Sequence, residues 1–229
     1  MRVLLTSNAS HVPPRGGSTR SNLIWLEHLA ASGHECRIVA AAPESDTEGK
    51  RSRLERELAD QQIGALASTA GGIPVHAVAD PAQRPAVLRN QIADFRPDWV
   101  LVSSEDLGHV LLREAHRAAP GRVVYLAHTP QFFPFGPASW NPDPQGATLV
   151  KRSAGIVAIG RHTAAYIERH TGRLPAVIHP PIYGAGPFEV FGHSGEGLIT
   201  MINPCAVKGV SIFLALARRL PHRRFAALE

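Results

Sequence analysis

The sequence is poor in the residues that define several common classes of protein. Its only cysteines are Cys36 and Cys205, too few for a disulfide framework. It has no run of about 18 apolar residues, which a transmembrane helix needs. The opening MRVLLTSN contains too short an apolar run for a secretory signal. We therefore expect a cytoplasmic protein, with peripheral attachment to a membrane as the alternative.

Motifs that bind common cofactors and metals are also lacking. The chain contains no GxGxxG and no GxxxxGK[ST], which disfavours dinucleotide and P-loop nucleotide binding. It contains no HExxH and no CxxC, so we expect no metal site. A nucleophilic hydrolase is unsupported because GxSxG is absent and Cys36 lies inside an expected strand.

The net charge is modest and its positive part is dominated by arginine. Lys and Arg number 24 against 19 Asp and Glu, a net charge of +5. The arginines are spread along the chain, and aromatic residues make up only 6% of it. A nucleic-acid interface gathers basic residues on one face with aromatic residues between them. We therefore expect no nucleic-acid partner.

What the chain does contain is an alternation of strand-like and helix-like segments. Apolar runs predict strands at 1–8, 36–42, 73–78, 98–104, 122–128, 155–160, 175–184, 198–203 and 224–229. Helical spacing of apolar residues predicts helices at 19–32, 48–62, 82–95, 107–118, 147–153, 162–172 and 209–220. This order indicates an α/β protein with a parallel sheet and helices on both faces.

A glycine-rich stretch divides the predicted elements into two groups. We expect a first domain at 1–184, a linker at 185–197, and the first β-α-β part of a second domain at 198–229. The chain then amounts to about one and a half domains. Apolar positions of the second part, such as Ile199 and Phe213, would lack sheet partners, which predicts aggregation or capture of a partner.

The first candidate site is the loop between the first strand and the first helix. Gly16 and Gly17 allow close approach of a ligand, and the free N–H groups of the following helix, capped by Ser18 or Thr19, point at the loop. His11 and Arg15 are candidate ligand contacts, and the alternative is a plain turn. A helix terminus contributes at most about 2 kcal/mol, whereas micromolar affinity needs roughly 8 kcal/mol. The ligand must therefore also contact another surface.

Two further loops follow strands whose carboxyl ends lie at the same edge of the expected sheet. Glu105 could bind a sugar hydroxyl, although a residue of 103–106 is expected to cap the next helix. His128 could donate to a hydroxyl or carbonyl oxygen, the alternative being a structural histidine. Beyond it, Trp140 and the phenylalanines at 132, 133 and 135 could stack on an acceptor or pack their own loop.

The segment NPCAVKG joins the strand and the helix of the second part. Lys208 lies at the start of that helix, where its ammonium group can bind a diphosphate. By itself, Lys208 is equally well explained as a surface residue.

Together these features resemble a retaining glycosyltransferase of the GT-B fold, of the family-4 type. The resemblance is carried by PPRGGSTRSNLIWLEHLAASGHE, LAHTP, GIVAIGRHTAAYI, VIHPPIYG and ITMINPCAVKGVSIFLALARRLP, in this order. It implies two Rossmann-like domains, the first binding mainly the acceptor and the second most of the nucleotide-sugar. It further implies metal-independent transfer from a nucleotide-diphosphate sugar, without another cofactor, to a small-molecule, lipid or glycan acceptor.

The resemblance also implies roles for particular residues. Gly16 and Gly17 match the glycine loop near the donor phosphate, His128 the strand-end histidine that contacts the transferred sugar, and Lys208 the diphosphate-binding lysine. Asn203 stands where the family commonly has an arginine, which puts one diphosphate contact in doubt. The family's glutamate-rich donor motif would lie beyond Glu229, so we expect this polypeptide alone to be weakly active or inactive.

Two alternatives differ in class. One is a non-catalytic module that binds an acceptor or a separate donor-binding chain. The other is a sugar-nucleotide epimerase of the same fold, which would be expected to carry paired acids or a histidine–acid system at its cleft.

Overall fold

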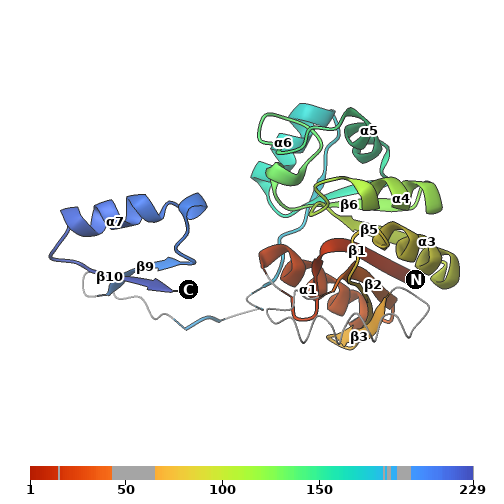
Figure 1. The fold of residues 1–229 in the computed structure, drawn as a ribbon, viewed down its shortest axis with the longest axis horizontal. Coiled ribbons are helices and arrows are strands. Elements are labelled where there is room, and N and C mark those ends of the chain that lie inside the picture. Colours follow the sequence, from red (N-terminus) through yellow and green to blue (C-terminus); the bar gives the residue numbers. More distant parts are fainter. Residues whose placement is uncertain (15, 43–64, 183, 185–186, 190–196, 229) are drawn as a thin grey trace. The chain divides into compact units, whose positions relative to one another are not determined.

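A computed structural model describes residues 1–14, 16–42, 65–182, 184, 187–189 and 197–228. It divides into two compact units, Met1–Gly184 and Ala185–Glu229 (Figure 1). The helix expected at 48–62 and most of the linker expected at 185–197 lie outside the described residues.

The first unit is built on one eight-stranded sheet, which confirms the expected α/β fold class. The strand order is β3-β4-β2-β1-β5-β6-β7-β8, a Rossmann-like arrangement in which the chain order reverses beside β1. The strands are β1 (Arg2–Ser10), β2 (Glu35–Ala41), β3 (Leu66–Ala70), β4 (Ile73–Val78), β5 (Trp99–Ser103), β6 (Val123–Ala127), β7 (Gly155–Ala158) and β8 (Ala176–Val177).

The edge strand β3 is a departure from the expected parallel sheet. It pairs with β4 in the antiparallel direction through a turn at Gly71 and Gly72, whose φ angles are 55° and 78°. The other neighbouring strands of this sheet run parallel. The sequence analysis missed β3 because its residues, LASTA, have neither a continuous apolar run nor a strict alternation.

Helices cover both faces of the sheet (Figure 1). On one face α1 (Gly17–Ala31) buries Leu23 and Leu26 against Val3 and Leu5 of β1. On the other face Leu4 belongs to a second core, built with α3 (Arg84–Phe95), α4 (Val110–Ala118), α5 (Pro144–Arg152) and α6 (Arg161–Thr171). Successive strand residues point to opposite faces, so the consecutive apolar residues Val3, Leu4 and Leu5 of β1 serve both cores.

Two helix starts differ from their expected positions. The fourth helix begins at Val110 rather than at 107, because Asp106 and His109 form a turn in which the His109 N–H donates to the Asp106 carbonyl at 2.8 Å. The fifth helix begins at Pro144 rather than at 147, since the side chain of Asp143 caps it by accepting from the Gln145 N–H at 3.0 Å.

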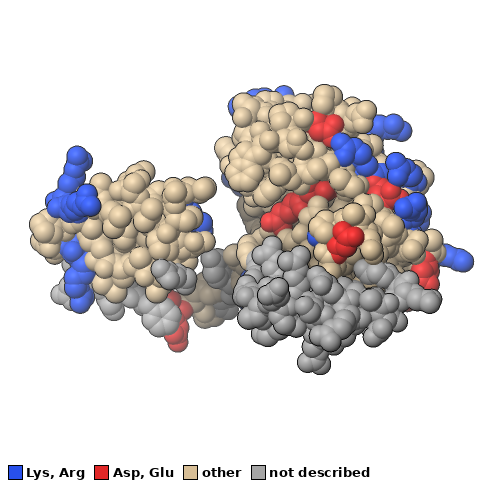
Figure 2. All heavy atoms as spheres, viewed as in Figure 1, with Lys and Arg blue, Asp and Glu red and all other residues tan. Residues whose placement is uncertain are grey.

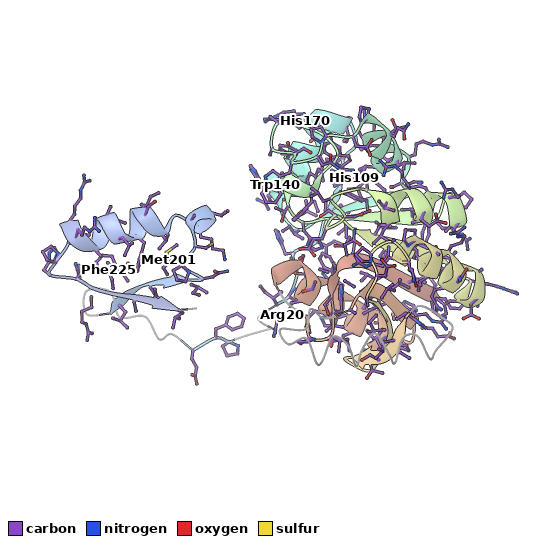
Figure 3. The ribbon with its side chains drawn as sticks, viewed as in Figure 1. Arg20, His109, Trp140, His170, Met201 and Phe225 are labelled. Carbon is purple, nitrogen blue, oxygen red and sulfur yellow. The ribbon has the colours of Figure 1, made fainter. Side chains whose placement is uncertain are left out.

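The second unit pairs β9 (Leu198–Ile202) with β10 (Arg224–Leu228) in parallel and connects them through α7 (Val210–Arg219). The rings of Phe213 and Phe225 meet edge to face with centroids 5.4 Å apart. Figure 3 shows Met201 and Phe225 between the strand pair and the helix. Among the described residues α7 contains no buried side chain.

The helices of the described residues include none that is both long and apolar enough to cross a membrane.

Candidate functional site

Three candidate loops meet because β1, β5 and β6 are neighbours in the sheet. Parallel strands end at a common edge, and the loops that follow these three carry His11, Glu105 and His128. Two of the hydrogen bonds described below, those of Asn22 with Ser103 and with His128, connect residues 81 and 106 positions apart in the chain. We refer to this group of side chains and the start of α1 as the carboxyl-edge site.

His128 is held within the carboxyl-edge site by three contacts. Its Nε2 lies 2.8 Å from Oδ1 of Asn22, and its backbone N–H donates to Oγ of Ser104 at 3.0 Å. Its ring stacks on Trp25 with centroids 6.0 Å apart. Asn22 in turn donates from Nδ2 to Oγ of Ser103 at 3.2 Å. The ring is therefore fixed in orientation and only 4% exposed.

His11 is the second histidine of the site and is fully buried. Its Nδ1 lies 3.1 Å from the Ala9 carbonyl oxygen, which can only accept, so Nδ1 carries the hydrogen. Its Nε2 has no hydrogen-bond partner among the residues that the structure describes. Such an orphaned buried acceptor costs about 1–3 kcal/mol, and a catalytic or ligand-binding role is one explanation for it.

Burial keeps both histidines neutral at physiological pH. Desolvation lowers the pKa of His11 to about 4, although its hydrogen bond to Ala9 acts in the opposite direction. Desolvation also lowers the pKa of His128 to about 4, and the proximity of His11 adds to this effect. A neutral imidazole has one donor and one acceptor nitrogen, so each ring can offer only one kind of hydrogen bond to a ligand.

The start of α1 lies beside these histidines in the chain and remains open. Gly16 precedes the helix with φ 94° and ψ 169°, a conformation that is essentially restricted to glycine. A Cβ atom added at Gly16 or at Gly17 would meet no atom of the described residues within 4 Å, their chain neighbours aside. The expected caps are wrong: α1 has no side-chain cap, and Thr19 instead donates back to the Gly16 carbonyl at 3.2 Å.

Ser18 donates its hydroxyl hydrogen to Oε1 of Glu105 and so joins the α1 start to the β5 loop. Oε2 of Glu105 is buried and has no hydrogen-bond partner in the part of the chain that the structure describes. Desolvation raises the pKa of Glu105, which the bond from Ser18 partly offsets. Glu105 does not cap the next helix, because Asp106 does so by accepting from the Leu112 N–H at 3.1 Å.

Asp106 also anchors a polar network that the sequence did not reveal. Its Oδ1 accepts from Nδ2 of Asn8 at 2.7 Å, and Oδ1 of Asn8 accepts from the Arg84 guanidinium. Desolvation raises the pKa of Asp106 and lowers that of Arg84. This network supports the turn that presents Glu105.

The aromatic segment after β6 is divided between the core and the surface of the first unit. Phe133 and Phe135 lie in the core, where Phe133 contacts Tyr125 and Tyr166. Trp140 is 65% exposed and packs edge to face on Phe132 (Figure 3). The structure therefore favours loop packing for Phe133 and Phe135 and leaves Trp140 accessible.

The remaining candidates lie apart from the carboxyl-edge site in the chain or outside the described residues. Arg15 falls outside the described residues. In the second unit Asn203 has φ 57° and donates its N–H to the Leu228 carbonyl at 2.7 Å. Lys208 is exposed and ends the short 3-10 helix Ala206–Lys208, two residues before α7.

Several charges on and beside α3 and α4 are paired locally. Figure 2 shows basic and acidic side chains interspersed over α3 and α4. Glu114 lies 3.2 Å from Arg89 and 2.7 Å from Arg117, and Arg37 lies 2.8 Å from Asp94. These pairs leave the described surface of both helices mixed in sign.

The fold and the carboxyl-edge site define a Rossmann-like α/β protein with buried polar side chains at the carboxyl edge of its sheet. Residues 15–183 match the sequence model of Glycosyltransferase Family 4, and the chain belongs to this family. No curated protein matches the sequence.

Solved structures similar to this chain include MurG from Acinetobacter baumannii, at 12% identity and a TM-score of 0.42 over 71% of this chain. The chain spans 42% of the length of that protein. The UDP-GlcNAc 2-epimerase of Neisseria meningitidis bound to UDP-GlcNAc is 16% identical, with a TM-score of 0.49 over 99% of this chain and 65% of that one. Phytolacca americana UGT2, complexed with UDP-2fluoro-glucose and pterostilbene, is 9% identical, with a TM-score of 0.45 over 100% of this chain and 71% of that one.

The sequence analysis missed Asn22 and Ser18 as members of the site. Asn22 is a buried polar residue on α1 between the buried Ser21 and Leu23. A polar residue inside the apolar stripe of a helix was the available signal, since such residues are buried only when hydrogen-bonded.

Proposed function

We propose that this chain provides the acceptor-binding domain, and part of the donor site, of a glycosyltransferase. The enzyme would transfer a sugar from a nucleotide-diphosphate sugar to an acceptor hydroxyl, with retention at the anomeric carbon. Family membership supports the reaction class. The open α1 start beside buried, hydrogen-bonding side chains is the observation that supports a ligand site at this edge of the sheet.

The α1 start is suited to the phosphate side of the donor. Its first N–H groups lack helical partners and carry the positive end of the helix dipole. Gly17 leaves open space in front of them. We propose that these groups neutralise charge on the leaving diphosphate without a metal ion. In the second unit, the exposed Lys208 is a separately proposed diphosphate contact.

The neighbouring side chains are suited to hydroxyl-bearing parts of a ligand. His128, His11 and Glu105 present buried polar atoms from three different loops. We propose that His128 contacts the transferred sugar, whereas His11 and Glu105 bind on the acceptor side. The exposed ring of Trp140 is the proposed stacking surface for a more distant part of the acceptor.

Substitution of Gly17 by alanine tests this proposal directly. The added methyl group meets no atom of the described residues within 4 Å, and the φ of Gly17 is not in the left-handed region, so the fold should be unaffected. We expect at least tenfold weaker binding of UDP-GlcNAc or GDP-mannose, measured by calorimetry or ligand-observed NMR, because the methyl occupies the phosphate position.

The matched control is Gly155→Ala at the opposite end of the sheet. Its new methyl would contact Val124 at an ordinary distance of 3.8 Å, and binding should be unchanged. Equal affinity of the Gly17→Ala and unsubstituted proteins for every nucleotide sugar that binds would contradict the proposed phosphate site. Epimerisation of UDP-GlcNAc in the absence of an acceptor would contradict the transferase assignment itself.

A further inference from the structure

The contacts of His128 determine which of its ring nitrogens carries hydrogen. Nε2 lies 2.8 Å from Oδ1 of Asn22, and an amide oxygen can only accept. On the other side of the amide, Nδ2 of Asn22 donates to Oγ of Ser103 at 3.2 Å. With Asn22 in this orientation, His128 donates from Nε2 into the protein.

The other ring nitrogen is left for a ligand. Nδ1 of His128 has no hydrogen bond to any of the residues that the structure describes. The ring cannot turn over without losing its bond to Asn22, and it is stacked on Trp25. Since burial keeps the ring neutral, Nδ1 is a lone-pair acceptor and not a donor.

We propose that Asn22 is a positioning residue that holds His128 as its Nε2–H tautomer, so that His128 accepts a hydrogen bond from a ligand hydroxyl. The ligand at this point of the site is then a neutral, polyhydroxylated group rather than an anionic oxygen. This reverses the donor role expected for His128 from the sequence. The class of ligand rests on the proposed function, whereas the tautomer is a property of the free protein.

His11 also presents a hydrogen-bond acceptor to the site, for an independent reason. Its Nδ1–H is committed to the Ala9 carbonyl at 3.1 Å, which leaves Nε2 as an acceptor. Oε2 of Glu105 is a further unpartnered oxygen. The carboxyl-edge site thus offers acceptors from its side chains, while the donors that suit a phosphate are the N–H groups at the start of α1.

The tautomer can be measured on the complete 229-residue chain. Long-range ¹H–¹⁵N correlation spectra distinguish protonated from unprotonated ring nitrogens, and the His128→Gln spectrum identifies the His128 signals. At pH 7 we expect Nε2–H for His128 and Nδ1–H for His11. Asn22→Leu should convert His128 to a mixture of tautomers, whereas the control Asn90→Leu on the exposed face of α3 should not.

Each outcome decides the proposal. His128 found as Nδ1–H in the unsubstituted protein overturns it, as does an unchanged Nε2–H signal in Asn22→Leu. If Asn22→Leu does not fold, Asn22→Asp is the second variant, because a carboxylate accepts a hydrogen bond more strongly than an amide. In that variant, a retained Nε2–H on His128 together with a raised His128 pKa supports the proposal. An Nδ1–H tautomer or an unchanged pKa overturns it.

A titration with UDP-GlcNAc and GDP-mannose in the same spectra separates this proposal from the proposed function. Failure of both to bind, with the Nε2–H tautomer observed, contradicts the proposed function alone. Binding that shifts the Nε2 signal of His128 but not its Nδ1 signal overturns the acceptor role.

Discussion

The segment from β1 to α1 and the segment from β9 to α7 are built alike but differ in burial. Each is an apolar strand followed by a loop, a glycine with positive φ and a helix: Gly16 has φ 94° and Gly209 has φ 83°. In the first, Leu5 and Leu26 are fully buried. In the second, Ile202 is 70% and Leu214 is 50% exposed.

The difference shows that the apolar pattern of a segment determines whether it forms a strand or a helix. How deeply the segment is buried depends on the strands and helices that pack around it. β1 pairs with β2 on one side and β5 on the other, and helices cover both of its faces. Among the described residues β9 pairs with β10 alone. The first segment is therefore able to hold polar groups in a dry site.

The largest effect expected from this comparison is on core packing. Leu26→Ala should lower the free energy of unfolding of the first unit by about 2–5 kcal/mol, because it leaves a cavity between α1 and the sheet. Urea unfolding followed by tryptophan fluorescence measures it, since Trp25, Trp99 and Trp140 all lie in the first unit.

Leu216→Ala on α7 is the matched substitution in the second unit. Leu216 is exposed, so the change should cost about 1 kcal/mol or less. Hydrogen exchange of the α1 and α7 amides measures the stability of the two units separately. A similar loss of protection in α1 of Leu26→Ala and in α7 of Leu216→Ala would contradict the expected difference between the two units.

A second expected effect is the acid sensitivity of the first unit. The folded-state pKa of His11 is about 4, below the ordinary value of 6.5, so the unfolded chain takes up protons first as the pH falls. The stability contributed by neutral His11 is complete above pH 6.5 and is lost progressively down to about pH 4, by roughly 3 kcal/mol.

His11→Gln should remove this part of the pH dependence, whereas His28→Gln on the exposed side of α1 should not. Glu105 and Asp106 act oppositely, because their pKa values are raised and protonation stabilises the fold as the pH falls. The difference between the pH–stability curves of the His11→Gln and unsubstituted proteins isolates the contribution of His11. Parallel pH–stability curves for both proteins would contradict the prediction.

The smallest expected difference concerns the two glycines that precede the helices. Gly16→Asn should cost about 1–3 kcal/mol, because φ 94° with ψ 169° is essentially restricted to glycine. Gly209→Asn should cost less than about 1 kcal/mol, since φ 83° with ψ 37° is left-handed helical and asparagine tolerates it. Circular-dichroism melting and amide exchange at α1 and α7 compare them, and equal costs would refute the conformational explanation.

Most elements could be predicted from the sequence because their signals are local. The apolar stripe of Leu23, Leu26 and Leu29 predicted α1, and the run WVLVS predicted β5. The antiparallel strand β3 was missed because its five residues carry no clear period. Its pairing depends on β4 and on the turn at Gly71 and Gly72.

The site was predicted only in outline. His11, Glu105 and His128 were selected because polar residues follow apolar strands at a common edge, but their roles there stay predictions. Asn22 was missed: its position in the apolar stripe of a helix indicates burial, but its partners Ser103 and His128 are 81 and 106 residues away in the chain. Ser18 was expected to cap α1, and it instead donates to Glu105.

The sequence by itself determined most of the order of strands and helices, β3 excepted, and the set of polar residues that follow the strands, because hydrophobic period and turn residues act over a few positions. Only the tertiary structure decided which nitrogen of each histidine is free, which carboxylate caps a helix and which aromatic rings are buried. Those properties depend on hydrogen-bond partners and desolvation supplied by distant segments. In the first unit the sheet brings these segments together at one edge.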